Sequence, residues 1–259
     1  MRAIWSGTIS FGLVNIPIRL FSATQHSRLD LDMLDAKDHS HIHFKRVNEK
    51  TGREVSYENI VKAYKYNGEY VVLDDEDFEH ANAKKTKTID IQNFVEEDEI
   101  DPMYFEDPYY IEPEKTGTKA YALLREALKK SGKVGISTFV LRNKESLAAV
   151  RVRENVLVLS KLRFEQEIRD TADLKIPSKA TLTAKEIEMA VKLINQHTEK
   201  FDISSYKDEY TDQLMDVIKQ KAKGKQPAKV HKLEVVHTKS KDLMAQLKAS
   251  LEQKVRKAS

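Results

Sequence analysis

Hydrophobic and polar positions over residues 1–165 follow a pattern of short strands separated by turns. Apolar and β-branched residues dominate residues 2–22, where Gly7 and Gly12 indicate turns or bulges and Pro17 indicates an edge or a bend. Residues 41–47 alternate in polarity, as a strand with one solvent-facing side does. Further strands are predicted at 61–66, 69–73, 88–95, 109–112, 134–141, 146–152 and 156–164. Many short strands with turn signals between them predict a sandwich or a barrel.

Local signals also mark one hairpin and one helix in this region. Asn67-Gly68 lies between two strand-like runs, and both central residues of a type I′ hairpin turn need positive φ. Apolar residues recur at helical spacing from about Thr118 to Lys130, and Gly132 follows as a left-handed cap. We therefore expect a β-dominated α+β fold with one good helix in the first 165 residues.

The character of the chain changes after Pro177. Thr183 and Glu186 have the spacing of a capping box, and amphipathic helices are predicted within 183–222. A basic linker follows, with Gly224 and Pro227, and is predicted to be flexible. The last helix has one narrow apolar stripe and is marginal in isolation. It is therefore either frayed in the free protein or docked, in a groove of a partner protein or on its own chain.

Composition narrows the class of protein. The absence of cysteine excludes disulfides, thiolate zinc sites and a cysteine nucleophile. No run of about 18 apolar residues and no signal peptide is present, which favours a cytoplasmic protein. Phosphate-binding glycine loops, nucleophile elbows and His-Glu-x-x-His motifs are also missing, so we expect neither an enzyme nor a cofactor.

Charge is unevenly distributed along the chain, although the net charge is only +3. Residues 71–114 contain 15 acidic and 3 basic residues, a net of −12, whereas residues 115–170 and 223–259 each carry a net of +7. Segregation of this kind predicts one acidic and one basic surface, and the basic surface would hold a polyanion.

Several segments resemble the bacterial Ku proteins. The longest runs from Arg2 to Pro17 (RAIWSGTISFGLVNIP), and shorter ones are ENIVKAY (58–64), EIDPMYF (99–105), GTKAY (117–121), LRNK (141–144), EIRD (167–170) and YKDEY (206–210). The tail DLMAQLKASL (242–251) is similar to the segment linked in that family to ligase recruitment. The resemblance covers nearly the whole chain.

The resemblance implies a fold and a function. Residues 1–170 would form a Ku-type antiparallel β-barrel with an extended DNA-encircling bridge at roughly 25–95. Residues 171–222 would form a dimer-supporting helical arm, and residues 223–259 a basic linker with a ligase-recruiting tail helix. The resemblance implies a ring-shaped homodimer that binds double-stranded DNA ends in non-homologous end joining. Its partner would be the ATP-dependent ligase D, and the chain itself would carry out no catalysis.

Two departures from the family pattern are visible. Some relatives carry a Cys-x-x-Cys pair where this chain has Asn48 and Thr51, neither of which is a usual structural zinc ligand. The tail is also shorter than the lysine-rich extension that many members carry. We therefore expect no metal here.

Sequence-independent binding of duplex DNA requires cations that contact phosphates. The candidates lie in the implied bridge and in the barrel turns; they are Lys45, Arg46, Arg53, Lys62, Lys65, Lys84, Lys85, Lys87, Arg142 and Lys144. The candidate partner-binding residues form the apolar stripe of the tail helix; they are Leu243, Met244, Leu247 and Leu251.

Other interpretations remain open at this level. His39, His41 and His43 would share one face of a strand, but alternate residues lie about 6–7 Å apart, too far for easy shared coordination of a metal. The acidic run from Glu96 to Glu99 could belong to a metal-dependent nuclease, but it is more typical of a solvated face. The chain could also be a general duplex-coating protein or a protein-interaction adaptor without preference for DNA ends.

Overall fold

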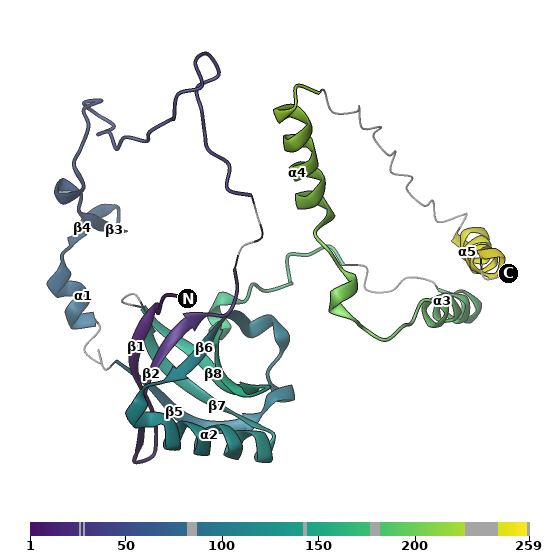
Figure 1. Cartoon of the computed structure of the whole chain (residues 1–259), viewed down its shortest axis with the longest axis horizontal. Helices are drawn as coiled ribbons and strands as arrows, with labels where there is room; N and C mark the ends of the chain where they lie inside the picture. Colours follow the sequence, from purple (N-terminus) through teal and green to yellow (C-terminus); the bar gives the residue numbers. More distant parts are fainter. Residues whose placement is uncertain are drawn as a thin grey trace. The chain divides into compact units, whose positions relative to one another are not determined.

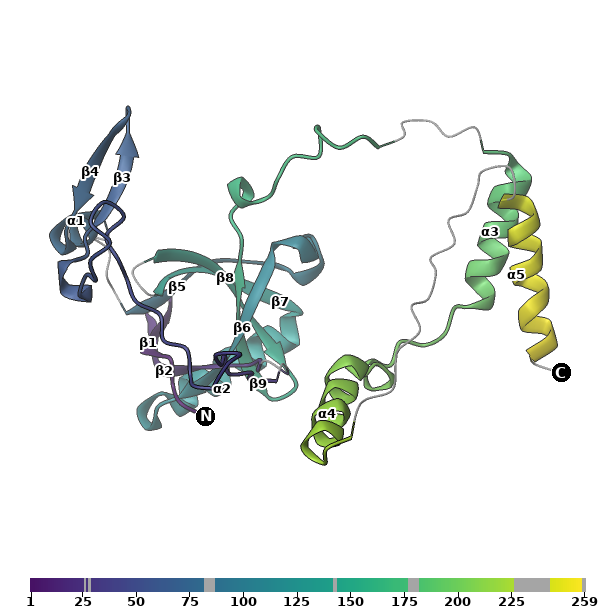
Figure 2. The same cartoon turned by 90° about the horizontal axis from the view of Figure 1, so that it is seen from above.

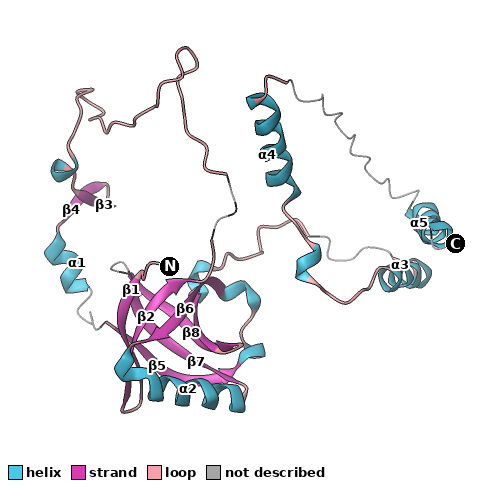
Figure 3. Cartoon of the chain, in the orientation of Figure 1, coloured by secondary structure: helices cyan, strands magenta, loops and turns pink. Residues whose placement is uncertain are grey.

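The computed structural model describes residues 1–25, 27, 29–81, 87–141, 144–176, 182–225 and 243–257. The chain divides into two compact units, one formed by residues 1–26 and 30–170 and the other by residues 27–29 and 171–259. The strands are β1 (Trp5–Phe11), β2 (Val14–Ser22), β3 (Lys62–Tyr66), β4 (Glu69–Leu73), β5 (Thr88–Glu96), β6 (Phe105–Pro113), β7 (Lys133–Leu141), β8 (Lys144–Arg153) and β9 (Val156–Leu162) (Figure 3). The α-helices are α1 (Asp75–Ala81), α2 (Thr118–Ser131), α3 (Ala184–Gln196), α4 (Glu209–Ala222) and α5 (Leu243–Lys257).

The first unit is built around a closed barrel with strand order β1-β2-β6-β9-β8-β7-β5 (Figure 1). The predicted barrel is therefore confirmed. Neighbouring strands pair antiparallel throughout, except at the seam, where β1 pairs in parallel with β5 from Thr8 opposite Thr88 to Ser10 opposite Asp90. Closure leaves no open sheet edge in the barrel, and it joins the start of the chain to a strand some 80 residues later.

The barrel interior is filled by alternate residues of the strands, as the pleat requires. Ile9 of β1, Ile18 and Leu20 of β2, and Leu157 and Leu159 of β9 are completely buried. A smaller cluster is formed by Val134, Ala149 and Leu162, with half-buried neighbours. The apolar positions that predict strands in the sequence therefore supply the core.

Gly7 lies inside β1 and not in a turn or bulge, contrary to the sequence interpretation. The indole of Trp5 folds over it, and the Lys87 carbonyl passes close by on the seam and accepts a hydrogen bond from the Thr8 N–H at 2.8 Å. A side chain at position 7 would meet both groups. This glycine is therefore explained by the close approach of two segments, which is a long-range feature.

Helix α2 packs against β2, β7 and β8 and runs along the lower side of the barrel in Figure 1. Its buried face consists of Tyr121, Leu124 and Leu128. Gly132 ends the helix with φ of 71°, as the sequence predicts. The Tyr121 hydroxyl is buried, donates to the Ile111 carbonyl at 2.9 Å and accepts from the Leu157 N–H at 2.8 Å.

We expect Tyr121→Phe to lower the free energy of unfolding by about 1–3 kcal/mol, because it leaves a buried donor and a buried acceptor unpaired at the ends of β6 and β9. Burial raises the pKa of the Tyr121 hydroxyl, so the group stays protonated and keeps both bonds near neutral pH. Urea unfolding measures the change, and Tyr66→Phe on the exposed hairpin is the control. Equal stability of the two variants would contradict the bridging role of the hydroxyl.

Between β2 and β5 the chain leaves the barrel and returns to it (Figure 1). We call residues 23–87 the excursion. It contains the predicted hairpin β3–β4, whose turn residues Asn67 and Gly68 have φ of 49° and 92°, and the short helix α1. Since β5 begins at Thr88 and pairs within the barrel, the excursion ends earlier than the boundary near residue 95 expected for a bridge.

The strand predicted over residues 41–47 is wrong. Only isolated bridges form there, between Leu34 and His41 and between Val47 and Glu54. His39, two residues before this run, has φ of 59°, so it does not extend a strand that would place it on one face with His41 and His43. Alternation alone does not produce a strand when no neighbouring strand is available to pair with it.

The second unit contains α3, α4 and α5. Thr183 and Glu186 form the predicted capping box at the start of α3, with the Glu186 N–H donating to Thr183 Oγ1 at 3.3 Å and the Thr183 N–H donating to Glu186 Oε2 at 2.7 Å. Asp208 caps α4 by accepting from the Thr211 N–H at 3.1 Å. The predicted linker falls largely in residues 226–242, outside the described residues. None of the described helices is both long and apolar enough to cross a membrane.

Candidate nucleic-acid interface

Charges that are segregated along the sequence pair with each other on the barrel. Carboxylates of the acidic segment meet cations of the basic segment; the pairs are Glu96 with Lys133, Glu97 with Arg151 at 2.5 Å, Glu106 with Lys161 at 2.5 Å, and Glu106 with Arg163 at 3.5 Å. The Glu106 carboxylate raises the pKa of Lys161. The expectation of separate acidic and basic surfaces is therefore wrong for these residues, because the pairing of β5 with β7 and of β6 with β9 brings the two segments together.

The excursion has a different character, because most of its surface is exposed. Its large aromatic residues lie open to solvent, with Phe44 80% and Tyr70 73% exposed. Cations are interleaved with these rings: the Arg46 guanidinium lies 5.3 Å from the centre of the Tyr57 ring, and the Lys62 ammonium lies 4.8 Å from the centre of the Phe78 ring. A cation over a ring keeps its charge, so both residues remain available to an anion.

The hairpin register places Lys62 and Lys65 on opposite faces of β3, because side chains three residues apart on a strand point to opposite sides. Lys62 shares a face with Tyr64 and Tyr66, whereas Lys65 lies opposite Tyr70 on the other. The two lysines do not form one patch by themselves. Each face of the hairpin carries one cation among exposed aromatic residues.

Two of the predicted cations are paired with carboxylates. Lys45 binds Glu54 at 2.6 Å, and Lys144 binds Glu167 at 3.2 Å. The pKa of Glu167 is lowered, first by the hydrogen bond from the Phe164 N–H and then by Lys144. These pairs are solvent-exposed, but an acidic neighbour reduces the attraction of each lysine for phosphate.

The side chains of Arg53, Lys65 and Lys87 contact no carboxylate or ring of any described residue. All three are exposed, and Lys87 stands where the excursion rejoins the barrel. Lys84, Lys85 and Arg142 lie outside the described residues. Among the described residues of the candidate set, these three cations make neither an ion pair nor a cation–π contact, whereas Arg46 and Lys62 contact a ring but no carboxylate.

The turn that carries Arg53 is closed by hydrogen bonds of Asn48. Asn48 Oδ1 accepts hydrogen bonds from the N–H groups of Lys50 at 3.0 Å and Thr51 at 3.1 Å, and the Asn48 N–H donates to the Arg53 carbonyl at 2.9 Å. An asparagine side chain of this kind organises a turn through the backbone. Within the described ranges, no group of three or more histidine or acidic residues is arranged to hold a metal ion.

Comparison with known proteins assigns the architecture to a family. The family model described as the Ku70/Ku80 beta-barrel domain matches residues 10–189, which is more than half of the chain. The chain belongs to the Ku family.

Relatives in this family are similar over most of their length. The Non-homologous end joining protein Ku of Opitutus terrae is 44% identical over 223 residues, covering 85% of this chain and 80% of that protein. The proteins of the same name from Coxiella burnetii and Archaeoglobus fulgidus are 37% and 39% identical, covering 98% and 97% of this chain and 95% and 99% of their own. Helices α4 and α5 lie beyond the residues matched by the Ku family model, but within the span of such relatives.

The predicted partner-binding residues lie on α5, which begins at Leu243. Met244, Leu247 and Leu251 are half-buried on one side of this helix. The Leu243 side chain lies outside the described residues. In this Ku chain α5 contacts α3, and Figure 2 shows the two helices side by side. The stripe is therefore at least partly covered in the free chain.

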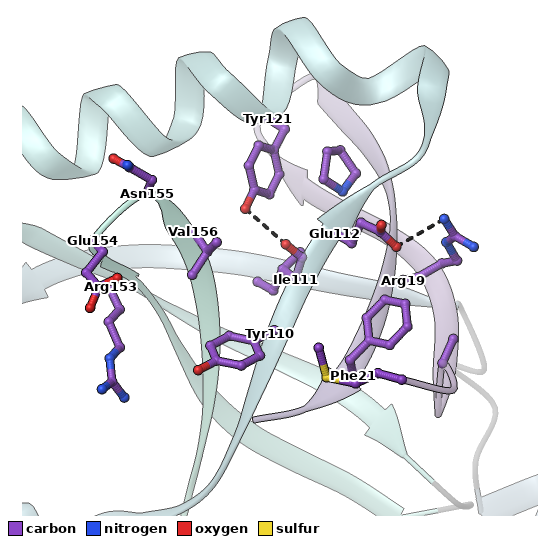
Figure 4. Close-up of a pocket in the computed structure, with 13 residues that line it drawn as sticks. Arg19, Phe21, Tyr110, Ile111, Glu112, Tyr121, Arg153, Glu154, Asn155 and Val156 are labelled. Atoms are coloured by element: carbon purple, nitrogen blue, oxygen red, sulfur yellow. Dashed lines mark hydrogen bonds and ion pairs between the residues drawn. The ribbon is translucent and has the colours of Figure 1, made fainter. Parts of the chain in front are cut away.

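A hollow on the barrel was not anticipated from the sequence. It has a volume of about 900 Å³ and an apolar lining that includes Phe21, Tyr110 and Val156. The Arg19–Glu112 ion pair, 3.0 Å long, stands at one end, and Arg153, the last residue of β8, stands at the other (Figure 4). Apolar lining with charged ends is typical of ligand pockets. Its residues come from widely separated segments of the Ku barrel, so no local motif marks it.

Proposed function

We propose that this chain binds the ends of double-stranded DNA, without reading their sequence, in non-homologous end joining. The observation that carries the proposal is the excursion, an exposed segment in which cations are interleaved with aromatic residues and whose two ends are held in neighbouring parts of one closed barrel. Phosphate contacts by Arg46, Arg53, Lys62, Lys65 and Lys87 would be independent of base sequence. Membership of the Ku family and the names of its relatives support the same role.

We propose further that the protein acts as a ring-shaped homodimer. The support is the amount of apolar surface that one chain leaves exposed on the excursion and on α3 and α4, including Phe44, Tyr70 and Ile194. Exposed apolar side chains in such number are typical of residues that a protein interface covers. A two-fold axis would give two excursions a symmetric arrangement around a duplex.

The tail helix α5 is proposed to recruit the ATP-dependent ligase D. Its apolar stripe, with Met244, Leu247 and Leu251, has the spacing of a helix that docks in a groove. The protein would act by binding and recruitment, in the cytoplasm, without a cofactor and without catalysis of its own.

Preference for DNA ends separates this proposal from a general DNA-coating protein. In one buffer, linear duplex and covalently closed circular duplex of equal length compete for the protein in a gel-shift assay. We expect strong preference for the linear form, because a ring must be threaded from an end. Equal competition by both forms would indicate an open basic surface and would favour the coating function. Binding to partner proteins without any DNA affinity would favour an adaptor.

A further inference from the structure

Helix α5, which is proposed to bind the ligase, contacts α3 of the same chain. The inference from this contact rests on that proposed role of α5. Helix α5 lies along α3 (Figure 2). Both belong to the second unit of the chain. The partner of the tail helix in the free protein is therefore a segment of the same chain.

Helix α3 has two apolar stripes with different exposure. Met189, Ala190 and Leu193 are half-buried, at spacings of one and three residues that place them on one side of the helix. Ile187 and Ile194, on the other stripe, are 51% and 64% exposed. Because α5 is the helix that contacts α3, we assign the half-buried stripe to the contact and the exposed one to solvent.

Helix α5 shows the matching pattern. Met244, Leu247 and Leu251 are half-buried, while Ala245 and Lys248 are exposed. Spacings of three and four residues put the half-buried set on one stripe. This is the stripe proposed to bind the ligase. One narrow stripe cannot pack against α3 and enter a groove of another protein at the same time.

The chain segment between α3 and α5 keeps the two helices close enough to bind each other, although the contact is weak enough for a partner to displace. Residues 197–242, which include α4, join the end of α3 to the start of α5. A tether of this length gives an effective concentration on the order of mM, so that even a weak contact is populated. A short amphipathic helix is itself only marginally stable, and the contact buries few side chains, so a partner with a better groove displaces it.

We propose that α3 is a built-in competitor for the tail helix, and that it covers the ligase-binding stripe of α5 until the ligase displaces it. The docked state lowers the apparent affinity for the ligase by the fraction of chains in which α5 is free. Recruitment of the ligase then depends on whether α5 is docked on α3.

The test compares three variants of the full chain. Leu193→Glu places a charge in the half-buried stripe of α3, and Asn195→Glu places the same charge at an exposed polar position of the same helix as the matched control. Leu247→Glu tests the proposed ligase-binding stripe itself. Hydrogen exchange of the α5 amides reports docking, and titration with the ATP-dependent repair ligase reports affinity.

We expect Leu193→Glu to accelerate exchange in α5 and to raise ligase affinity about 5- to 30-fold, as the loss of a competing contact of modest strength does. Asn195→Glu should change neither quantity. Unchanged exchange in the Leu193 variant would overturn the assigned contact. Faster exchange with equal or weaker ligase binding would overturn the competition, because α3 would then not oppose the ligase.

A fourth variant keeps both helices intact. Inserting a flexible segment as long as residues 197–242 within residues 226–242 doubles the length of chain between α3 and α5. This lowers the effective concentration of α5 near α3 and should raise ligase affinity by up to about threefold. If neither α5 exchange nor ligase affinity changes, α3 does not compete with the ligase for α5. The proposed recruitment fails separately: if Leu247→Glu binds the ligase as the unmodified chain does, α5 is not the recruiting element, whatever the Leu193 variant does.

Discussion

Changing Arg53, Lys65 and Lys87 together to glutamate is expected to lower affinity for linear duplex DNA on the order of 10³-fold. These cations are exposed and contact no carboxylate of any described residue, so each is free to neutralise a phosphate. Each lost phosphate contact should lower the slope of log affinity against log salt by about 0.9, and three by about 2.7. Fluorescence anisotropy with a labelled linear duplex over a salt series measures both quantities.

The control carries the same change in net charge on another surface. Lys119, Lys129 and Lys130 are exposed on α2, and their reversal to glutamate tests long-range charge without touching the excursion. We expect a decrease of less than about threefold, because screening limits the field of distant surface charges. If the α2 variant loses as much affinity as the excursion variant, net charge and not local contact controls binding.

Much of the fold is predictable because its signals are local. The turn at Asn67-Gly68 has positive φ at two adjacent residues, and Gly132 ends α2 in the left-handed conformation. Thr183 and Glu186 pair with each other's backbone N–H groups at the start of α3. Each signal depends on residues within a few positions. Together with the resemblance of the opening run to Ku, they are sufficient to predict the barrel and the helices that follow.

Features that depend on distant segments escape prediction. The parallel seam between β1 and β5 joins residues about 80 positions apart, and its only mark in the sequence is Gly7, whose local context indicates a turn. The alternation of residues 41–47 predicts a strand, although no partner strand exists for it within the described residues. Period and propensity describe one segment, whereas pairing is a property of two.

The same limit applies to the candidate interface. The sequence places Lys45 and Lys144 among the candidate cations, but their carboxylate partners stand nine and 23 residues away. Nothing in the sequence separates these compensated lysines from Lys65 or Lys87. The candidate DNA-binding residues stay predictions as a set. The structure indicates which of them to test first, because it shows which lysines are paired with a carboxylate.

Replacing Gly7 with valine is expected to lower the free energy of unfolding by about 3 kcal/mol or more, at the upper end of what overpacking costs. A Cβ at this position would overlap the Lys87 carbonyl and the Trp5 indole. Neither group is free to move. The carbonyl accepts the seam hydrogen bond from Thr8, and the indole donates to the Val140 carbonyl at 3.2 Å and meets the Phe139 ring edge to face. Urea unfolding measures the loss.

Ser6→Val is the matched control, because it adds the same β-branched side chain to the residue that precedes Gly7 in β1, on the exposed side of the barrel. We expect it to change stability by less than about 0.5 kcal/mol. Gly7 also lies where the excursion returns to the barrel, so a wedge there should loosen the anchoring of Lys87. A destabilised Gly7 variant should therefore lose DNA affinity even below the denaturant concentration at which it unfolds. If Gly7→Val proves as stable as Ser6→Val, the seam does not close as described, and the anchoring of the excursion at β5 would have to be revised.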